Sequence, residues 1–277
     1  MKNRDNTSFI ELLVTPNLRT STFKMLQHIQ YKAESYDTLL LNLPIELENK
    51  VEELVSEQIT QDELLEHIMK HKIIPQPITS WTYTAQPLLE ALPRLHRDHP
   101  NLKIHCYHST EAMTDSMNVS TVYAQLTLRT IITNKIEHNS WRETINKSLQ
   151  TNSETLAKNS KNIQNKSGTT TACITDSTSH HLKQKLTQTG ATIKTTYIEK
   201  PYHFTPLAII ERKTTQKPLT NKQLDELIHH HIHYIKNYIY HHQNRDRAHL
   251  EWTQDKKPWP KLKIERREIA LLDNLIP

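Results

Sequence analysis

Glycine is nearly missing from this chain. Two glycines, Gly168 and Gly190, occur among 277 residues, whereas a typical protein uses roughly 7% glycine. Glycine allows positive φ angles and a close approach of the backbone to a ligand. Phosphate-binding loops of the Walker-A, dinucleotide and kinase types each need several glycines close together, and these two are isolated. The sequence therefore excludes nucleotide binding through a glycine-rich phosphate cradle.

The composition is that of a folded, mildly basic chain. Hydrophobic residues make up 35% and charged residues 23%, and the net charge is +5 with a pI near 9.0. Cys106 and Cys173 lie in apolar runs, so we expect buried thiols rather than a disulfide or a pair of nucleophiles. The N-terminal residues are polar, and no apolar run approaches the roughly 18 residues of a membrane span. The sequence therefore predicts a cytoplasmic protein with no membrane partner.

Short apolar runs alternate with helical patterns along the chain. Five runs are expected strands and one more is a candidate strand: 8–14, 36–44, 102–107, 170–176, 191–199 and, as the candidate, 207–211. The run from Leu39 to Leu41 is apolar on both faces, which is typical of a buried parallel strand. No hairpin turn of the Asn-Gly type joins the runs. The pattern predicts an α/β fold with a mostly parallel sheet flanked by helices, followed by a long C-terminal helix and a basic tail.

The C-terminal part of the chain has a different character. The longest expected helix covers 218–242, and His231 and His242 fall on its apolar face as core histidines. His229 and His233 fall on the opposite side, where we expect solvent. A polar stretch at 159–167 is interpreted as a linker. The predicted organisation is an α/β domain over 1–217 and a C-terminal helix with a basic extension over 218–277.

Polar side chains lie at or after the carboxyl end of each expected strand, where ligands bind in open parallel sheets. They include His108, Ser109 and the following candidate residues: Asn17, Arg19, Asn42, Glu111, Asp176, His180, His181 and His203. Imidazoles and carboxylates in one place can hold a divalent metal or perform acid–base chemistry. The alternative is that these loops are polar because strand-end loops face water.

Three segments carry a resemblance to a known family. They are YDTLLLNLPIELENKVEELV from residue 36, LRTIITNKIEHNSWRETI from residue 128 and TTACITDSTSHHLKQKLTQTGATI from residue 170. The order of these segments, and the pattern of residue types within them, are similar to the TraB/TIKI/ChaN/erythromycin-esterase-like superfamily. The resemblance covers about two thirds of the chain and leaves out the part from residue 218 onward. Members of that superfamily are thought to be metal-dependent hydrolases or proteins of unknown role on the same scaffold.

The resemblance, together with the strand-end positions, implies a possible metal-dependent hydrolase. Its catalytic residues would be His180, His181, Glu111 and Arg129, with Arg129 orienting an anionic group. Its metal ligands would be His180, His181, His203 and Asp176, holding a divalent metal such as Mn, Zn or Fe. Its substrate-binding residues would be Asn17, Arg19 and Asn42.

Two departures from the superfamily pattern favour an alternative function. Asn17 stands where the superfamily has a histidine in its first loop, and Asn42 stands where it has a glutamate. An amide oxygen binds a metal more weakly than a carboxylate because it carries no full charge. These replacements favour a catalytically silent binding or scaffold protein that acts through protein partners or self-association.

Acidic and basic residues are concentrated in different parts of the chain. The charged segments could bind the partners of a scaffold protein, and the basic one also suggests a third function. Eight acidic residues face one lysine between Glu46 and Glu66, although a charged helix face of this kind is usually only solvated. The C-terminal stretch KKPWPKLKIERR combines basic and aromatic residues, as single-strand binders do. Nucleic-acid binding by this tail is the third candidate function.

Overall fold

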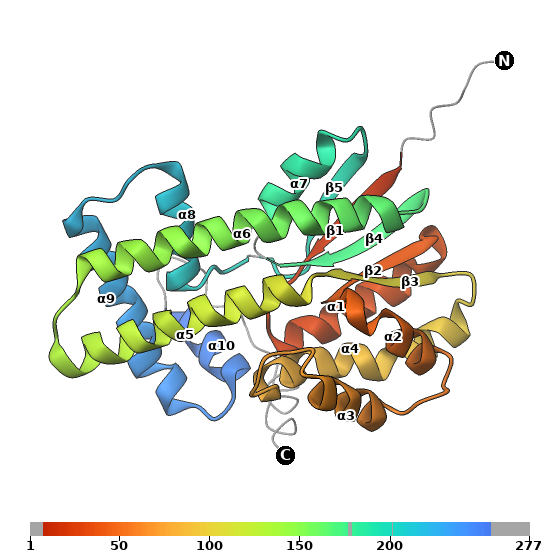
Figure 1. Cartoon of the computed structure of the whole chain (residues 1–277), viewed down its shortest axis with the longest axis horizontal. Coiled ribbons are helices and arrows are strands. Elements are labelled where there is room, and N and C mark those ends of the chain that lie inside the picture. The colour runs from red at the N-terminus through yellow and green to blue at the C-terminus, as the bar shows by residue number, and fades with distance from the viewer. Residues whose placement is uncertain (1–7, 177–178, 201, 256–277) are drawn as a thin grey trace. The chain divides into compact units, whose positions relative to one another are not determined.

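The computed structural model describes residues 8–176, 179–200 and 202–255, with Ser179 and His180 described by their backbone alone. The chain divides into two units. Met1–Asn118 with Gln150–Tyr202 forms what we call the sheet unit, and Val119–Leu149 with His203–Pro277 forms the helical unit. The helices α5 (Thr110–Thr133) and α6 (His138–Lys166) contribute residues to both units (Figure 1). This division differs from the expected boundary between residues 217 and 218.

The strands of the sheet unit form one parallel sheet in the order β3-β2-β4-β1-β5. They are β1 (Phe9–Val14), β2 (Thr38–Pro44), β3 (Lys103–His108), β4 (Thr170–Thr175) and β5 (Thr192–Tyr197). All five coincide with expected strands, so the predicted parallel α/β fold is confirmed. The sixth candidate strand is wrong, because residues 207–211 lie in α8 (Pro206–Gln216). The Thr205 hydroxyl accepts a hydrogen bond from the Ala208 N–H at 3.4 Å, and this cap followed by proline starts a helix.

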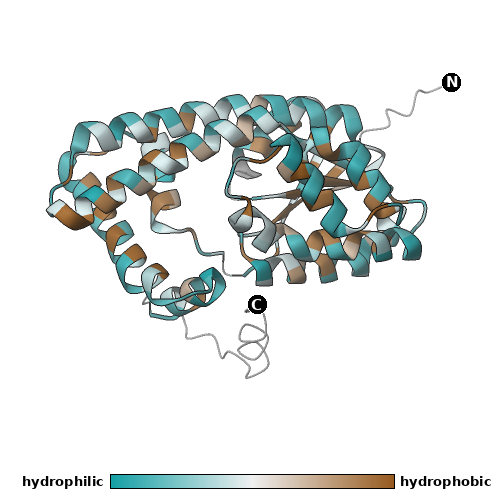
Figure 2. Ribbon diagram, turned by 60° about the horizontal axis from the view of Figure 1, so that its bottom comes forward, coloured by the Kyte–Doolittle hydropathy of each residue, from teal (hydrophilic) through white to brown (hydrophobic). Residues whose placement is uncertain are grey.

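Helices cover both faces of the sheet, and each face has its own core. The first face packs against helices that follow β1 and β2: α1 (Arg19–Lys32), α2 (Glu48–Val55), α3 (Gln61–His71) and α4 (Thr79–Asp98). The second face packs against the C-terminal half of α6 and α7 (Ser179–Thr187). Leu39 and Leu41 point into the first core and Leu40 into the second, as expected for a strand that is apolar on both faces. In Figure 2 the buried strands are mostly brown, whereas the surrounding helices carry much teal.

The sheet has a topological switch point between β4 and β1. These strands are neighbours, yet the helices that follow them pack on opposite faces. Met25 and Ile29 of α1 belong to the first core, and Leu182 and Leu186 of α7 belong to the second. In open α/β sheets this arrangement marks the edge at which ligands bind. A ligand is therefore expected at the carboxyl edge of the sheet.

The two glycines both have structural reasons. A Cβ atom at Gly168 would collide with the Asp37 carboxylate and lie 2.6 Å from the Thr38 hydroxyl. That carboxylate accepts hydrogen bonds from the N–H groups of Thr169 at 2.8 Å and Thr170 at 3.1 Å, so it is held in place. Gly190 follows α7 with a φ of +86°, a conformation that glycine commonly adopts just after the end of a helix. Neither glycine serves a phosphate cradle.

The helical unit has a core of its own, built from α5, α6, α8 and α9 (Asn221–Asn237). The unit also contains α10 (Arg245–Asp255). His231 is 7% exposed, which confirms the expected core histidine. His229 and His233 are exposed, also as expected. The helix expected over 218–242 is shorter, because a capping box at Thr220 begins α9 and an irregular backbone at Tyr238 ends it.

The linker expected at 159–167 is wrong. This stretch is the last part of α6, which continues to Lys166 in the sheet unit. Ile163 is fully buried and Asn159 is 6% exposed. Packing of one apolar side chain into the sheet core therefore outweighs the polar composition of the stretch, which alone indicated a loop.

Candidate functional site

His108 is the last residue of β3 and lies at the carboxyl edge of the sheet. Its Nδ1 atom is 3.1 Å from the carbonyl oxygen of Ser109. A carbonyl oxygen can only accept a hydrogen bond, so Nδ1 carries the proton and Nε2 carries the lone pair of a neutral imidazole. Among the described residues, the hydrogen bond that this ring forms is the one from Nδ1. In this tautomer Nε2 is the atom of the ring that can accept a proton.

The surroundings of His108 favour the neutral ring while providing nearby negative charge. Burial lowers the pKa of His108 below its usual value of 6.5. The Ser109 carbonyl and the carboxylates of Asp176 and Glu46 act in the opposite direction without cancelling the effect of burial. Asp176 follows β4 and Glu46 follows β2. Because these strands are neighbours, both carboxylates lie at the carboxyl edge of the sheet. Such carboxylates stabilise the imidazolium that forms when a histidine takes up a proton.

Glu46 is held by the first turn of α5. The Thr110 hydroxyl donates a hydrogen bond of 2.5 Å to Glu46 Oε2. Ser109 precedes this helix, and its hydroxyl accepts a hydrogen bond from the Ala112 N–H at 3.4 Å. These contacts fix the direction in which α5 leaves β3 and with it the position of His108. The sequence placed His108 among the strand-end residues but did not single it out, because its tautomer and its carboxylate neighbours depend on the strand order.

The substrate-binding residues expected from the sequence all belong to the sheet unit. Asn17 is exposed in the loop after β1. Arg19 opens α1, donates a hydrogen bond to the Gln86 side chain at 2.9 Å and lies over the rings of Tyr83 and Phe23. Asn42 lies near the carboxyl end of β2, as expected, and its Oδ1 atom is buried without a hydrogen-bond partner among the described residues. A buried amide oxygen without a hydrogen bond lowers the stability of the fold. The Asn42 oxygen can therefore still accept a hydrogen bond.

The residues expected to be catalytic are dispersed. Glu111 lies in the first turn of α5, is largely exposed and pairs with Lys158. Arg129 belongs to the helical unit and forms an ion pair of 2.9 Å with Glu137. His181 is exposed on α7. The side chain of His180 lies outside the described residues.

The predicted metal ligands are not tested as a group. Asp176 and His181 belong to the sheet unit, His203 belongs to the helical unit, and the His180 side chain is not described. Within the described ranges, no three His, Cys, Asp or Glu side chains gather closely enough to hold a metal ion. The divalent metal therefore stays a prediction from the resemblance.

A second group of charged side chains closes the free edge of β3. Glu48 Oε2 accepts a hydrogen bond from the Cys106 N–H at 3.0 Å, and Lys166 donates to the Cys106 carbonyl at 2.9 Å. Glu48 also contacts His105 Nδ1 at 2.8 Å. Edge strands expose unpaired backbone groups that invite pairing with another chain. This cluster has a structural explanation, and His105 therefore serves as a comparison for His108.

The cysteines behave as expected. Cys106 and Cys173 are free and fully buried, and burial raises the pKa of both thiols. A thiol with a raised pKa is a poor nucleophile at neutral pH. Both are therefore core residues.

No helix of the described residues is both long and apolar enough to cross a membrane. The basic stretch KKPWPKLKIERR lies outside the described residues, so nucleic-acid binding by it stays a prediction. Comparison with family models, with curated proteins and with solved structures found no match to this chain. The resemblance to the TraB/TIKI/ChaN/erythromycin-esterase-like superfamily accordingly stays a prediction as well.

Proposed function

We propose that this protein is a hydrolase that acts at the carboxyl edge of its parallel sheet, with His108 as the general base. The observation that supports the proposal is the hydrogen bond of 3.1 Å from His108 Nδ1 to the Ser109 carbonyl. It leaves Nε2 as the basic atom of a ring whose pKa is lowered by burial. A base of this kind is available at neutral pH, which general base catalysis requires.

In the proposed reaction, His108 Nε2 takes a proton from a water molecule as its oxygen attacks the acyl carbon of the substrate. Asp176 and Glu46 stabilise the imidazolium that results. The proton on Nε2 then passes to the leaving group as the acyl bond breaks, which restores the neutral ring. Asn42, whose side-chain oxygen lacks a donor, is proposed to accept a hydrogen bond from the substrate.

The charges at this edge restrict the substrate class. Glu46 and Asp176 both act on His108, and two nearby carboxylates repel an anion. Arg129, which the resemblance assigned to an anionic group, pairs with Glu137 in the helical unit. We therefore propose small neutral or cationic esters and amides as substrates. The described residues do not assemble a metal site.

The test compares two histidines of one strand. Full-length, tag-free protein is assayed with p-nitrophenyl acetate as a neutral ester and acetylthiocholine as a cationic one. We expect His108→Gln to lower kcat/KM by about 10²–10⁴-fold, the usual contribution of a general base. His105→Gln is the matched control, because His105 lies on β3 but contacts Glu48 at the strand edge. Equal rates for the wild type and His108→Gln would reject the proposal.

Metal analysis of the same tag-free preparation tests the prediction that comes from the resemblance. About one Mn, Zn or Fe per chain, lost in a His180→Ala/His181→Ala variant, would add a metal to the site. The protein is purified without a nickel column, because exposed His229 and His233 lie one turn apart on α9.

A further inference from the structure

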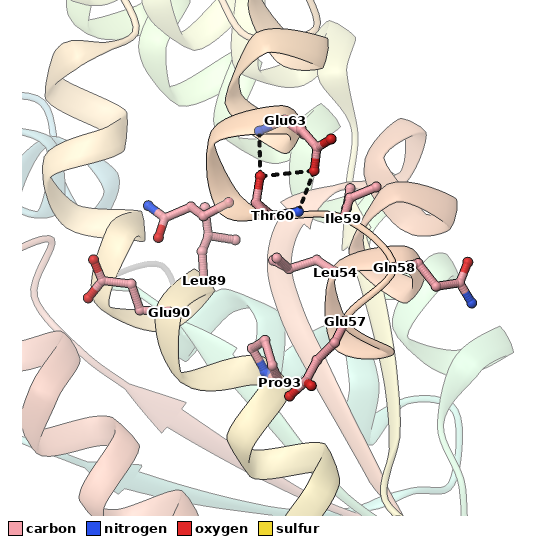
Figure 3. A pocket seen from close by; sticks show the side chains of 10 residues that line it. Leu54, Glu57, Gln58, Ile59, Thr60, Glu63, Leu89, Glu90 and Pro93 are labelled. Atoms are coloured by element: carbon pink, nitrogen blue, oxygen red, sulfur yellow. Dashed lines mark hydrogen bonds between the residues drawn. The ribbon is translucent and has the colours of Figure 1, made fainter.

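The sheet unit contains a pocket in the helical layer on the first face. It has a volume of about 380 Å³ and lies between α2, the loop that follows it, the start of α3 and α4 (Figure 3). Leu54 and Leu89 are buried side chains that line it, together with Pro93. The volume is within the range of pockets that bind ligands in proteins, and such pockets are lined mainly by apolar side chains.

Three glutamates surround this apolar lining: Glu57, Glu63 and Glu90. Glu57 pairs with Arg97. Glu63 accepts hydrogen bonds from the backbone and hydroxyl of Thr60, which lower its pKa and keep it ionised. Glu90 accepts a hydrogen bond from the Gln86 side chain at 2.6 Å. Within the described residues neither Glu63 nor Glu90 forms an ion pair, although Lys50 acts on Glu63 from a distance, so the pocket presents negative charge beside an apolar floor.

The complement of this pocket is a segment with cationic groups on both sides of an apolar side chain. Residues 256–267 of this chain contain such a segment: four lysines and two arginines face one glutamate, and Trp259 lies among them. Trp259 and Leu262 supply apolar surface, and Lys257, Lys261 and Lys263 supply charge within a few residues of it. Segments that join an aromatic anchor to flanking charges are well suited to binding in a pocket.

We propose that the pocket between α2, α3 and α4 binds the segment 256–277 of a second copy of this chain. Each copy carries this pocket and this segment, so a reciprocal exchange uses both and closes a dimer. The apolar floor receives Trp259, and Glu63 and Glu90 face the flanking lysines. This interaction is independent of hydrolysis at the carboxyl edge of the sheet.

The experiment measures the mass of the full chain by light scattering at increasing protein concentration. We expect a dimer whose dissociation constant rises at least tenfold in Glu90→Lys and in the double variant Lys261→Glu/Lys263→Glu. Glu66→Lys is the matched control, because Glu66 is an exposed glutamate on α3 that does not line the pocket. Combining Glu90→Lys with Lys261→Glu/Lys263→Glu in one chain restores opposite charges, and we expect the dimer to return.

A second measurement keeps the result independent of folding defects. A fluorescent peptide of residues 256–277 is titrated with the Lys261→Glu/Lys263→Glu variant, and its anisotropy is followed. We expect saturable binding that weakens with salt and is lost when Glu90→Lys is added to that protein variant. A monomer at all concentrations, or a dimer that Glu90→Lys and Glu66→Lys affect equally, would overturn the proposal. Peptide binding that Glu90→Lys leaves unchanged would overturn it too.

Discussion

Glu11 Oε1 lies 2.9 Å from Lys194 Nζ, and this ion pair joins the interior strand β1 to the edge strand β5. Glu11 is only 3% exposed, and Lys32 approaches the same oxygen at 3.3 Å. Burial raises the pKa of the Glu11 carboxyl, but hydrogen bonds from Thr196 at 2.6 Å, from Lys194 and from Tyr36 at 2.8 Å bring it down to about 2. The pairing explains how an ionised side chain is kept inside the sheet unit.

Glu11→Gln is expected to destabilise the sheet unit by about 2–4 kcal/mol, because two lysines lose their buried partner. The folded pKa is depressed, so this stability is present above the unfolded pKa, near 4.5, and is lost as the pH falls toward 2. Urea unfolding between pH 7 and pH 3 measures both effects. In the variant the slope below pH 4.5 is reduced, whereas Glu34→Gln, at an exposed position, leaves stability and slope unchanged.

Gly168→Ala is expected to cost about 1–3 kcal/mol, because the new methyl group collides with a carboxylate that is held by two backbone N–H groups. Thermal unfolding of Gly168→Ala, Asp37→Ala and the double variant separates the causes. The double variant should lose less than the sum of the single variants, since removal of the Asp37 carboxylate makes room for the methyl group. Full additivity would show that the collision is not the reason.

Asp176→Asn is expected to lower the pKa of His108 further, because the Asp176 carboxylate raises that pKa in the folded protein. The measurement is an NMR titration of the His108 ring protons, which needs no substrate. If the protein hydrolyses the probe esters, the acidic limb of kcat/KM should move to lower pH by the same amount. A pKa of His108 that does not respond to Asp176→Asn would show that the two side chains are not coupled.

The helical unit is expected to lose stability as the pH falls below 6.5. Burial lowers the pKa of His231 to about 4, and burial with the nearby charge of His203 does the same for His249. Both folded values lie below the unfolded value of 6.5, so the unfolded chain takes up protons first. Stability is therefore full above pH 6.5 and is lost as the pH falls toward 4, by about 3 kcal/mol for each histidine.

His231→Gln tests this pH dependence while keeping a hydrogen-bonding group near the Thr127 hydroxyl, which lies 3.1 Å from His231 Nε2. The variant should remove about half of the loss between pH 6.5 and pH 4 in urea unfolding followed by fluorescence. His229→Gln, at an exposed position on the same helix, should leave the pH dependence unchanged. A loss that both variants leave intact would exclude His231 as its source.

Particular side chains show where prediction from the sequence stopped. Glu11 is the single charged residue in the apolar run of β1, and that isolation was the available signal for a buried ion pair. Its partners Lys32 and Lys194 lie far away in the chain, so periodicity does not reveal them. His231 was predicted correctly as a core residue because it shares the helical spacing of the apolar side chains around it. Residues 207–211 were predicted wrongly because a short apolar run has the same pattern in a strand and in a buried helix.

The sequence by itself determined the five strands, the parallel α/β class and the burial of the cysteines, because these depend on the local spacing of apolar residues. It also excluded a glycine-rich phosphate loop through composition alone. Only the tertiary structure decided the strand order β3-β2-β4-β1-β5. That order brings Asp176 and Glu46 to His108, and helix packing forms the pocket beside Leu89. These juxtapositions arise from long-range packing, which acts between residues that no local pattern connects.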